Sequence, residues 1–453
     1  MTHNPLTRQM MEEFFSVGCK PREQWGIGTE HEKISFDLNT SQPVPYEGER
    51  GIGVLLQRLA DAHWQPVYEG ENIIALQGAG GASITLEPGG QLELSGAVLS
   101  NMHQTHEETR QHLEQVMQIA NSMGIGFLTT AFHPLSPQAA IPWMPKARYA
   151  VMGQYMPKVG SRGLDMMLRT ATVQANLDFS SEADMARKMR ISCCVQPIIT
   201  ALFAASPFCE GKPSGYLSTR AACWLDTDPN RTGIPSCVFE DDFGFSAWVD
   251  YLLDVPMYFI IREGQYIDCS GASFRDFIAG HLPALPGQMP TLDDWALHSS
   301  TVFPDVRLKQ YIEMRGADAG PHEMITALPA LCKGLLYDAE AESAAWQMVK
   351  AWSHSDVLAM REAVVSQGLH ATMAGESLQH WSSILLRLAE DGLQRQHQCN
   401  AAGEDESIYL APLWKITHNH ASLARQWLES YQNRWGQQIE PMFTEARHAV
   451  TAK

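Results

Sequence analysis

The chain has 453 residues and a formal net charge of −18 at pH 7, from 33 Lys and Arg against 51 Asp and Glu. Nucleic acids and anionic membranes are bound by concentrated Lys and Arg, so this charge argues against both as partners. The composition, 45% hydrophobic and 19% charged, is that of an ordinary soluble protein, and no apolar run reaches the roughly 18 residues of a membrane-spanning helix.

The cysteines and the N-terminal segment indicate the cellular compartment. The nine cysteines show no C-x-x-C spacing and no paired metal motif, which predicts reduced thiols in a cytosolic enzyme. Residues 1–20 are polar and lack the apolar segment of a signal peptide. We therefore expect a cytoplasmic protein without disulfides.

The first predicted strand carries two glutamates on one face. After a short amphipathic helix over residues 5–17, residues 27–36 read as a strand that contains Glu30 and Glu32. Residues two apart in a strand point to the same face, about 6–7 Å apart. Like charges at that distance disfavour ionisation unless a cation lies between them, so a divalent metal bound through oxygen is the first hypothesis. His31 points to the other face, and we expect a buried structural residue there.

A predicted hairpin supplies two more carboxylates. Residues 83–87 and 91–94 read as two strands joined by the turn Pro88-Gly89-Gly90. Glu87 and Glu93 then lie near one end of the hairpin. Further elements are expected as helices over residues 48–60 and 101–123 and as a strand over residues 125–132.

A strand with a polar face follows a long loop in the middle of the chain. Residues 133–165 are rich in Pro, Gly and Met and read as an irregular loop that closes over a site and carries Lys146, Arg148, Lys158 and Arg162. Residues 170–178 alternate strictly between polar and apolar side chains. The polar face consists of Thr170, Thr172, Gln174, Asn176 and Asp178. Five polar side chains do not face a dry core without partners, so we expect them to floor a solvated pocket.

The second half begins with another loop and a charged strand. A helix over residues 182–205 precedes a loop over residues 206–242 that contains Arg220 and Trp224, and residues 255–261 read as a strand. Residues 307–315 read as a strand with Leu308, Ile312 and Met314 on one face and Arg307, Lys309, Glu313 and Arg315 on the other. We expect such a strand to line a site that binds an anionic group or several metal ions. Residues 330–453 are expected to form a mostly helical C-terminal layer over one catalytic unit.

The carboxylates of these segments form one candidate set of oxygen ligands. The set comprises Glu30, Glu32, Glu87, Glu93 and Glu313, with Gln174 as a neutral ligand. Mg²⁺ prefers oxygen ligands and keeps waters for substrate phosphates. The alternative for any one glutamate is an exposed position or a salt bridge to Arg169 or Arg315. The chain has no Walker A loop, no G-x-G-x-x-G after a strand and no H-E-x-x-H motif, so a nucleotide would bind through carboxylates and metal.

Several longer segments together resemble one enzyme family. They are GTEHEK at 28–33, EPGGQLELSG at 87–96, MPKVG at 156–160, residues 164–178, EGKP at 210–213 and YIEMRGAD at 311–318. These strings resemble the plant-type glutamate–cysteine ligases, a group shared by plants and many proteobacteria. The resemblance extends over nearly the whole chain and is far more specific than any single motif.

The resemblance implies a fold and a reaction. The expected fold is α+β, a curved and mainly antiparallel sheet of the glutamine synthetase-like type with helices outside it, as one catalytic domain over residues 1–453. The implied reaction is ATP-dependent ligation of the γ-carboxylate of L-glutamate to the amine of L-cysteine through γ-glutamyl phosphate, the first step of glutathione biosynthesis. Two or more Mg²⁺ ions, with Mn²⁺ as a substitute, are the implied cofactors, and glutathione is a candidate feedback inhibitor.

The resemblance also implies roles for individual residues. Metal ligands would be Glu30, Glu32, Glu87, Glu93 and Glu313, with Gln174 where distant relatives place a histidine. Arg315 would hold the transferring phosphoryl group, and Arg220 and Lys158 would clamp substrate carboxylate or phosphate. Thr172, Asn176 and Trp224 would contact substrate. The alternatives are a structural salt bridge for Arg315, a surface role for Lys158 and a core position for Trp224.

Two other functions remain open from the sequence. One is a related carboxylate–amine ligase with another amine acceptor, and the other is a non-catalytic sensor of an amino acid or nucleotide on the same fold. A sensor could lose metal ligands without penalty, whereas this chain keeps all five glutamates. Plant members use disulfides as a redox switch, but no two cysteines stand here in matching loops, so redox regulation is not expected.

Overall fold

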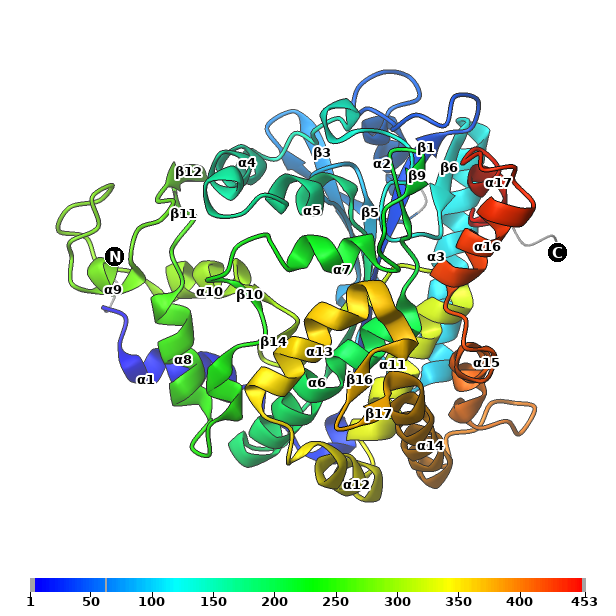
Figure 1. The fold of residues 1–453 in the computed structure, drawn as a ribbon. Coiled ribbons are helices and arrows are strands. Elements are labelled where there is room, and N and C mark those ends of the chain that lie inside the picture. Colours follow the sequence, from blue (N-terminus) through cyan, green and yellow to red (C-terminus); the bar gives the residue numbers. More distant parts are fainter. Residues whose placement is uncertain (1–4, 62, 450–453) are drawn as a thin grey trace.

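The computed structural model describes residues 5–61 and 63–449 and is built on one large antiparallel sheet (Figure 1). Its nine strands run in the order β14-β15-β7-β1-β5-β4-β3-β2, and β6 pairs with the distal half of β1. The strands are β1 (Ile27–Asp37), β2 (Gln65–Glu69), β3 (Asn72–Gln77), β4 (Ser83–Leu86), β5 (Leu92–Ser95), β6 (Ile125–Leu128), β7 (Thr172–Leu177), β14 (Val306–Leu308) and β15 (Ile312–Asp318). Neighbouring strands are antiparallel throughout.

Helices surround this sheet. The helices of the first 300 residues are α1 (Arg8–Ser16), α2 (Ile52–Ala60), α3 (Met102–Ser122), α4 (Ala147–Val159), α5 (Gly163–Arg169), α6 (Glu182–Phe203), α7 (Thr219–Trp224), α8 (Phe245–Asp254), α9 (Phe274–Ile278) and α10 (Leu292–Ser300). Short strand pairs lie outside the sheet: β8 (Phe208–Cys209) with β9 (Lys212–Pro213), β10 (Thr232–Gly233) with β13 (Phe303–Pro304), β11 (Phe259–Arg262) with β12 (Gln265–Asp268), and β16 (Thr372–Met373) with β17 (Glu376–Ser377).

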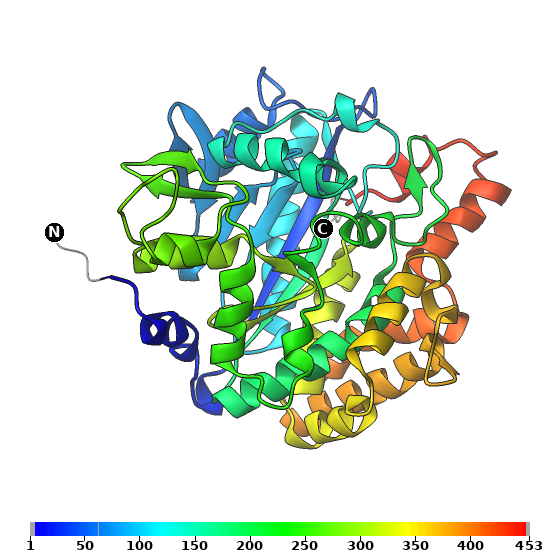
Figure 2. The same cartoon turned by 60° about the vertical axis from the view of Figure 1, so that its left-hand side comes forward.

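The C-terminal part is helical, as predicted from its sequence pattern. It comprises α11 (His322–Leu336), α12 (Ala339–Val349), α13 (His354–Gln367), α14 (Leu378–Gln396), α15 (Ala411–Asn419), α16 (Leu423–Asn433) and α17 (Met442–Glu445). These helices, yellow to red in Figure 1, gather on one side of the molecule. In Figure 2 the blue and light-blue strands pass through the middle of the molecule. The teal helices α4 and α5 lie above these strands, away from most of the C-terminal helices.

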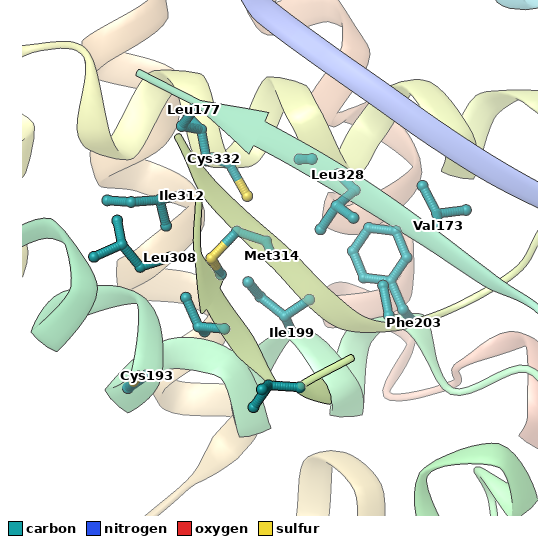
Figure 3. Packing of buried hydrophobic residues seen from close by; sticks show 14 of the residues in the cluster. Val173, Leu177, Cys193, Ile199, Phe203, Leu308, Ile312, Met314, Leu328 and Cys332 are labelled. Atoms are coloured by element: carbon teal, nitrogen blue, oxygen red, sulfur yellow. The ribbon is translucent and has the colours of Figure 1, made fainter. Parts of the chain in front are cut away.

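One face of the sheet is apolar and packs on α6 and α11. Figure 3 shows Val173 and Leu177 of β7 beside Met314 of β15, facing Ile199 of α6 and Leu328 of α11. All five side chains are at most 1% exposed. Fully burying one such side chain stabilises the fold by about 1.5–3 kcal/mol. Because side chains alternate along a strand, this packing turns the polar residues of β7 to the opposite face, as the sequence predicted.

The predicted loop over residues 133–165 is wrong in its second half. Helix α4 covers most of it, and α5 begins at Gly163. Tyr149, Met152 and Met156 are buried at helical spacing, which gives α4 an inward face. The Pro and Gly content hid this pattern, but Pro157 lies in the last turn and Gly160 ends the helix, where a Cβ would collide with the backbone of the 226–227 segment.

Other element boundaries also differ from the predictions. The single strand predicted over residues 307–315 is the hairpin of β14 and β15, closed where the Lys309 N–H donates to the Tyr311 carbonyl at 2.8 Å. The predicted loop over 206–242 contains α7, the strand predicted over 125–132 stops at Leu128, and the one predicted over 255–261 begins at Phe259. These two strands thus begin later or end earlier than predicted, and the loop contains a short helix that tertiary packing stabilises.

The buried imidazole of His298 predicts an acid-labile fold. Its Nε2 donates to the Leu252 carbonyl at 2.8 Å and its ring stacks on Phe274, and burial lowers its pKa to about 4. A lowered pKa stabilises the fold fully above the unfolded value near 6.5, and this contribution is lost as pH falls towards 4. The loss is on the order of 3 kcal/mol, since one pKa unit corresponds to about 1.4 kcal/mol.

Thermal unfolding between pH 7 and 4 checks this expectation. His298→Phe should flatten the pH dependence of the melting temperature, whereas His380→Phe, at an exposed position, should not. Parallel curves for wild type and His298→Phe would contradict it.

Candidate active site

The polar face of the sheet brings together glutamates of two strands and a glutamine of a third. Glu32 of β1 pairs with Glu93 of β5, and Glu30 of β1 pairs with Gln174 of β7. Directly opposed residues of neighbouring strands point to the same face, so these side chains form one surface. They line a cavity of about 440 Å³ together with Glu87, which follows β4.

A tight turn places Glu87 at the cavity. The Gly90 N–H donates to the Glu87 carbonyl at 2.9 Å, and Gly90 has φ +82°, a left-handed conformation that favours glycine. A Cβ on Gly89 would collide with the Leu168 carbonyl at the end of α5. The turn therefore docks closely on α5, and the hairpin predicted from the sequence is confirmed.

The carboxylates are crowded, with Glu93 buried and Glu30, Glu32 and Glu87 half-buried. Burial, with the charges of Glu313 and Glu93, raises the pKa of Glu30 to about 7. Burial and the charges of Glu87 and Glu93 hold the pKa of Glu32 well above its usual value. Burial and the charge of Glu87 raise the pKa of Glu93, although hydrogen bonds from Ser95 and Glu30 oppose the rise. Because their negative charges repel one another, carboxylates this close together favour the binding of a cation between them.

The donors fit an oxygen-binding metal in type and in charge. Glu30, Glu32, Glu87 and Glu93 offer carboxylate oxygens, which Mg²⁺ prefers. The raised pKa values of Glu30, Glu32 and Glu93 come from burial and from the negative charge of neighbouring glutamates. Over residues 5–61 and 63–449, no group of three or more His, Cys, Asp or Glu side chains is already arranged to hold a metal ion. The carboxylates therefore line one cavity without forming a closed coordination site.

Glu313 is surrounded by cations. Arg307 binds it with both Nε, at 2.7 Å, and Nη2, at 3.1 Å, Lys309 Nζ lies 2.9 Å from Oε1, and Arg315 Nη1 lies 2.7 Å from Oε2. The carboxylate is fully buried, and despite that burial these cations hold its pKa well below the usual value. Both oxygens of Glu313 are thus bound by cations, whereas the glutamates on β1 and β5 accept hydrogen bonds from neutral groups.

Arg315 connects this cluster to the predicted ligand Gln174. Its Nη1 donates to Gln174 Oε1 at 2.6 Å, so one guanidinium joins β15 to β7 beside Glu30. Its backbone carbonyl accepts from Arg220 Nη2 at 2.8 Å and from Thr172 Oγ1 at 3.1 Å. Both arginines and Thr172 line the cavity. The arginine predicted to hold a phosphoryl group is therefore fixed at its side chain and at its backbone.

The other predicted substrate contacts differ in their positions. Trp224 lines the cavity at the end of α7, and Arg220 is only 3% exposed there. Asn176 does not line the cavity but donates to Glu30 Oε1 at 2.7 Å. Lys158 is exposed near the end of α4 and lies outside the cavity lining. The structure thus brings together the predicted residues except Lys158, with Asn176 and Glu313 just behind the cavity surface.

Several cavity residues were not assigned from the sequence. Lys146, Arg148 and Tyr149 enter from the start of α4, and Arg307 and Lys309 enter from the β14–β15 hairpin. Lys146 Nζ and Tyr149 Oη both donate to the Leu86 carbonyl, at 2.7 and 2.5 Å, which fixes α4 over the Glu87 turn. The charges of the hairpin and those of Lys146 and Arg148 were visible in the sequence, in segments expected near a site. The helical form of α4 was hidden, because its segment read as a loop.

The back of β1 is chemically the opposite of its front. His31 is 1% exposed and Lys33 is fully buried, and Lys33 Nζ lies 3.2 Å from His31 Nδ1. Burial lowers the pKa of Lys33 to about 7. The prediction that His31 is a buried residue on the face opposite Glu30 is confirmed.

Comparison with known proteins identifies the family. A model described as glutamate-cysteine ligase family 2 matches residues 26–445. The chain belongs to this family. It is 49% identical over 442 residues to the chloroplastic glutamate–cysteine ligase of Brassica juncea, covering 97% of this chain and 84% of the relative. It is also 49% identical over 442 residues to the Arabidopsis thaliana protein of that name, covering 97% and 83%.

A solved structure confirms the type of fold. Glutamate–cysteine ligase from Francisella tularensis in complex with AMP superposes with a TM-score of 0.58 at 12% identity, covering 93% of this chain and 87% of that chain. The expected α+β fold with a mainly antiparallel glutamine synthetase-like sheet is therefore confirmed.

The comparisons correct the predicted compartment. The prediction of a cytoplasmic protein is wrong, because the similar plant ligases of this family are named chloroplastic. All nine cysteines are free thiols in the structure. In the part of the chain that the structure describes, no helix combines the length and apolarity needed to cross a membrane.

Proposed function

We propose that this protein joins the γ-carboxylate of L-glutamate to the amine of L-cysteine at the expense of ATP. The observation that carries the proposal is the cavity in which four glutamates of the sheet face the guanidinium groups of Arg315 and Arg220. A cavity with anionic and cationic walls suits phosphoryl transfer between two anions, which depends on positioning and charge neutralisation. The family membership supports the same reaction.

The proposed reaction has two steps. A γ-carboxylate oxygen of glutamate attacks the terminal phosphorus of ATP, the bond to the bridging oxygen breaks, and ADP leaves. The cysteine nitrogen then attacks the acyl carbon of γ-glutamyl phosphate, loses a proton, and inorganic phosphate leaves as the amide bond forms. Arg315 stabilises the charge of the transferring phosphoryl group as a planar donor, and Arg220 binds a substrate carboxylate or phosphate beside it.

Metal ions belong to this proposal. Glu30, Glu32, Glu87 and Glu93 would hold Mg²⁺, with Gln174 as a neutral ligand, and bound Mg²⁺ neutralises phosphate charge. The resemblance to the family is what supports Glu313 as a further ligand. In the structure its carboxylate binds Arg307, Lys309 and Arg315 and so orients the cations of the cavity. Thr172, Asn176 and Trp224 would shape the substrate site.

Phosphate release tests the reaction and its acceptor. Mg-ATP is supplied with glutamate alone, with cysteine alone and with both, and the product is identified by mass. We expect turnover that requires both amino acids and yields γ-glutamylcysteine. Turnover with glutamate and another amine instead of cysteine would overturn the acceptor, and metal-dependent ATP binding without turnover would overturn the catalytic function.

Removal of divalent metal is expected to abolish turnover reversibly. Without a cation the crowded carboxylates repel both each other and the phosphates of ATP. Chelation with EDTA should reduce phosphate release to background, and added Mg²⁺ or Mn²⁺ should restore it. Full activity in EDTA-treated, metal-free buffer would contradict the proposed ligand set.

A further inference from the structure

An ion pair in the C-terminal layer reaches the wall of the cavity from behind. Arg361 of α13 binds Asp305 with two donors, Nε at 2.6 Å from Oδ2 and Nη2 at 3.0 Å from Oδ1. The two side chains are only 13% and 14% exposed. Arg361 Nη2 also donates to the Trp224 carbonyl at 3.2 Å, so one guanidinium holds α7 and the segment before β14 together.

Both held segments carry or support the cationic wall. The Asp305 carbonyl accepts from the Arg315 N–H at 3.0 Å, while the Arg315 carbonyl accepts from Arg220 Nη2 at 2.8 Å. Arg220 and Trp224 lie on α7, four residues apart. A cavity of about 20 Å³, large enough for about one water molecule, adjoins the large cavity where Arg361, Asp305 and these residues meet.

Arg361 itself does not line the large cavity, so it acts only through these neighbours. A buried ion pair is weak evidence for stability, because desolvation offsets much of the attraction, but a bidentate pair fixes geometry closely. We propose that Arg361, through Asp305, is a positioning residue that sets Arg315 and Arg220 against the carboxylates of the sheet. The inference rests on the ligase function proposed above.

A double-mutant cycle with Arg315 tests the inference. Arg361→Gln is expected to lower kcat about 10- to 100-fold, since small misplacements of catalytic groups cost that much. Arg315→Lys is expected to lower kcat as well. The fold-reduction in kcat of the double variant should be smaller than the product of the two single-variant fold-reductions, because loss of Arg361 cannot misplace an arginine that has already been replaced. The KM for cysteine, which reacts after phosphoryl transfer, should stay unchanged.

Matched variants separate positioning from general stability. Arg262→Gln removes a similar bidentate pair, with Asp294 at 2.6 and 2.9 Å, that lies outside both cavities, and its kcat should equal that of wild type. Asp305→Asn keeps the shape of the side chain and should reproduce the coupling if Arg361→Gln does not fold. Wild-type kcat in Arg361→Gln and Asp305→Asn, or losses that multiply in the double variant, would overturn the inference. Lack of turnover in the wild type would instead overturn the proposed function.

Discussion

Glu30→Gln is expected to reduce turnover by about 100- to 1,000-fold while the protein stays folded. The amide keeps the shape of the side chain but removes one charge from the carboxylate face. Because the pKa of Glu30 is raised to about 7, the fold already accepts its neutral form. The measurement is phosphate release across a Mg²⁺ titration, together with a thermal unfolding curve.

The same substitution has a predictable effect on stability. A carboxyl with a raised pKa stabilises the fold fully below its unfolded pKa near 4.5 and loses that contribution as pH rises through 7. Metal-free Glu30→Gln should therefore be more stable than the metal-free wild type at pH 8, by up to about 3 kcal/mol, and equal to it at pH 4. This gain in stability with a loss of activity is the signature of a functional rather than a structural charge.

Glu342→Gln is the matched control. Glu342 is also a buried carboxyl with a pKa raised by burial, but it pairs with Arg187 at 3.2 Å and lies outside the cavity. Its turnover should match the wild type. Near-normal turnover of Glu30→Gln at saturating Mg²⁺ would remove Glu30 from the proposed ligand set.

Glu313→Gln is expected to lower both the stability of the fold and the activity, whereas Glu30→Gln lowers only the activity. The amide cannot neutralise Arg307, Lys309 and Arg315, which surround the fully buried carboxylate. Breaking a buried charge pair costs about 3–5 kcal/mol, because the remaining charge is left without a partner. The free energy of unfolding from urea titration measures the loss.

The sign of the pKa shift sets the pH range of this loss. The lowered pKa of Glu313 stabilises the fold above its usual value near 4.5, so the difference between wild type and Glu313→Gln should persist at neutral pH and shrink in acid. Glu210→Gln serves as the control, since its carboxylate pairs with Arg169 at 3.2 Å but is 54% exposed. An exposed pair contributes about 0–1 kcal/mol. Equal losses in the two variants would contradict the anchoring role of Glu313.

The strand periodicity carried most of the correct predictions. Glu30 and Glu32 on β1 and the alternation of β7 fix which side chains share a face, and that rule needs only the local sequence. The hairpin turn at Gly89 and Gly90 was readable for the same reason, because few residues adopt its backbone conformation. These segments sufficed to place the carboxylates of the sheet in one cavity.

What escaped prediction depends on contacts between distant segments. The segment that carries Lys146 and Arg148 was expected to close over the site as a loop, but it is helix α4, whose pattern Pro157 obscured. The engagement of Glu313 with Lys309 requires the chain to turn back at the β14–β15 hairpin, which no turn residue marks. The pairing of Arg361 with Asp305 joins residues 56 positions apart and has no local signal at all.

Because the two faces of β1 carry different chemical groups, the number of residues in this strand determines which groups face the cavity. Glu30 and Glu32 look into the cavity, while His31 and Lys33 are enclosed behind it. Insertion or deletion of one residue between Gly28 and Glu30 would reverse every later side chain of the strand. The cavity would then present an imidazole and an ammonium group where it now presents carboxylates, and two acidic side chains would enter the core. A change of one residue in the length of this strand would therefore remove the proposed ligands as completely as their replacement would.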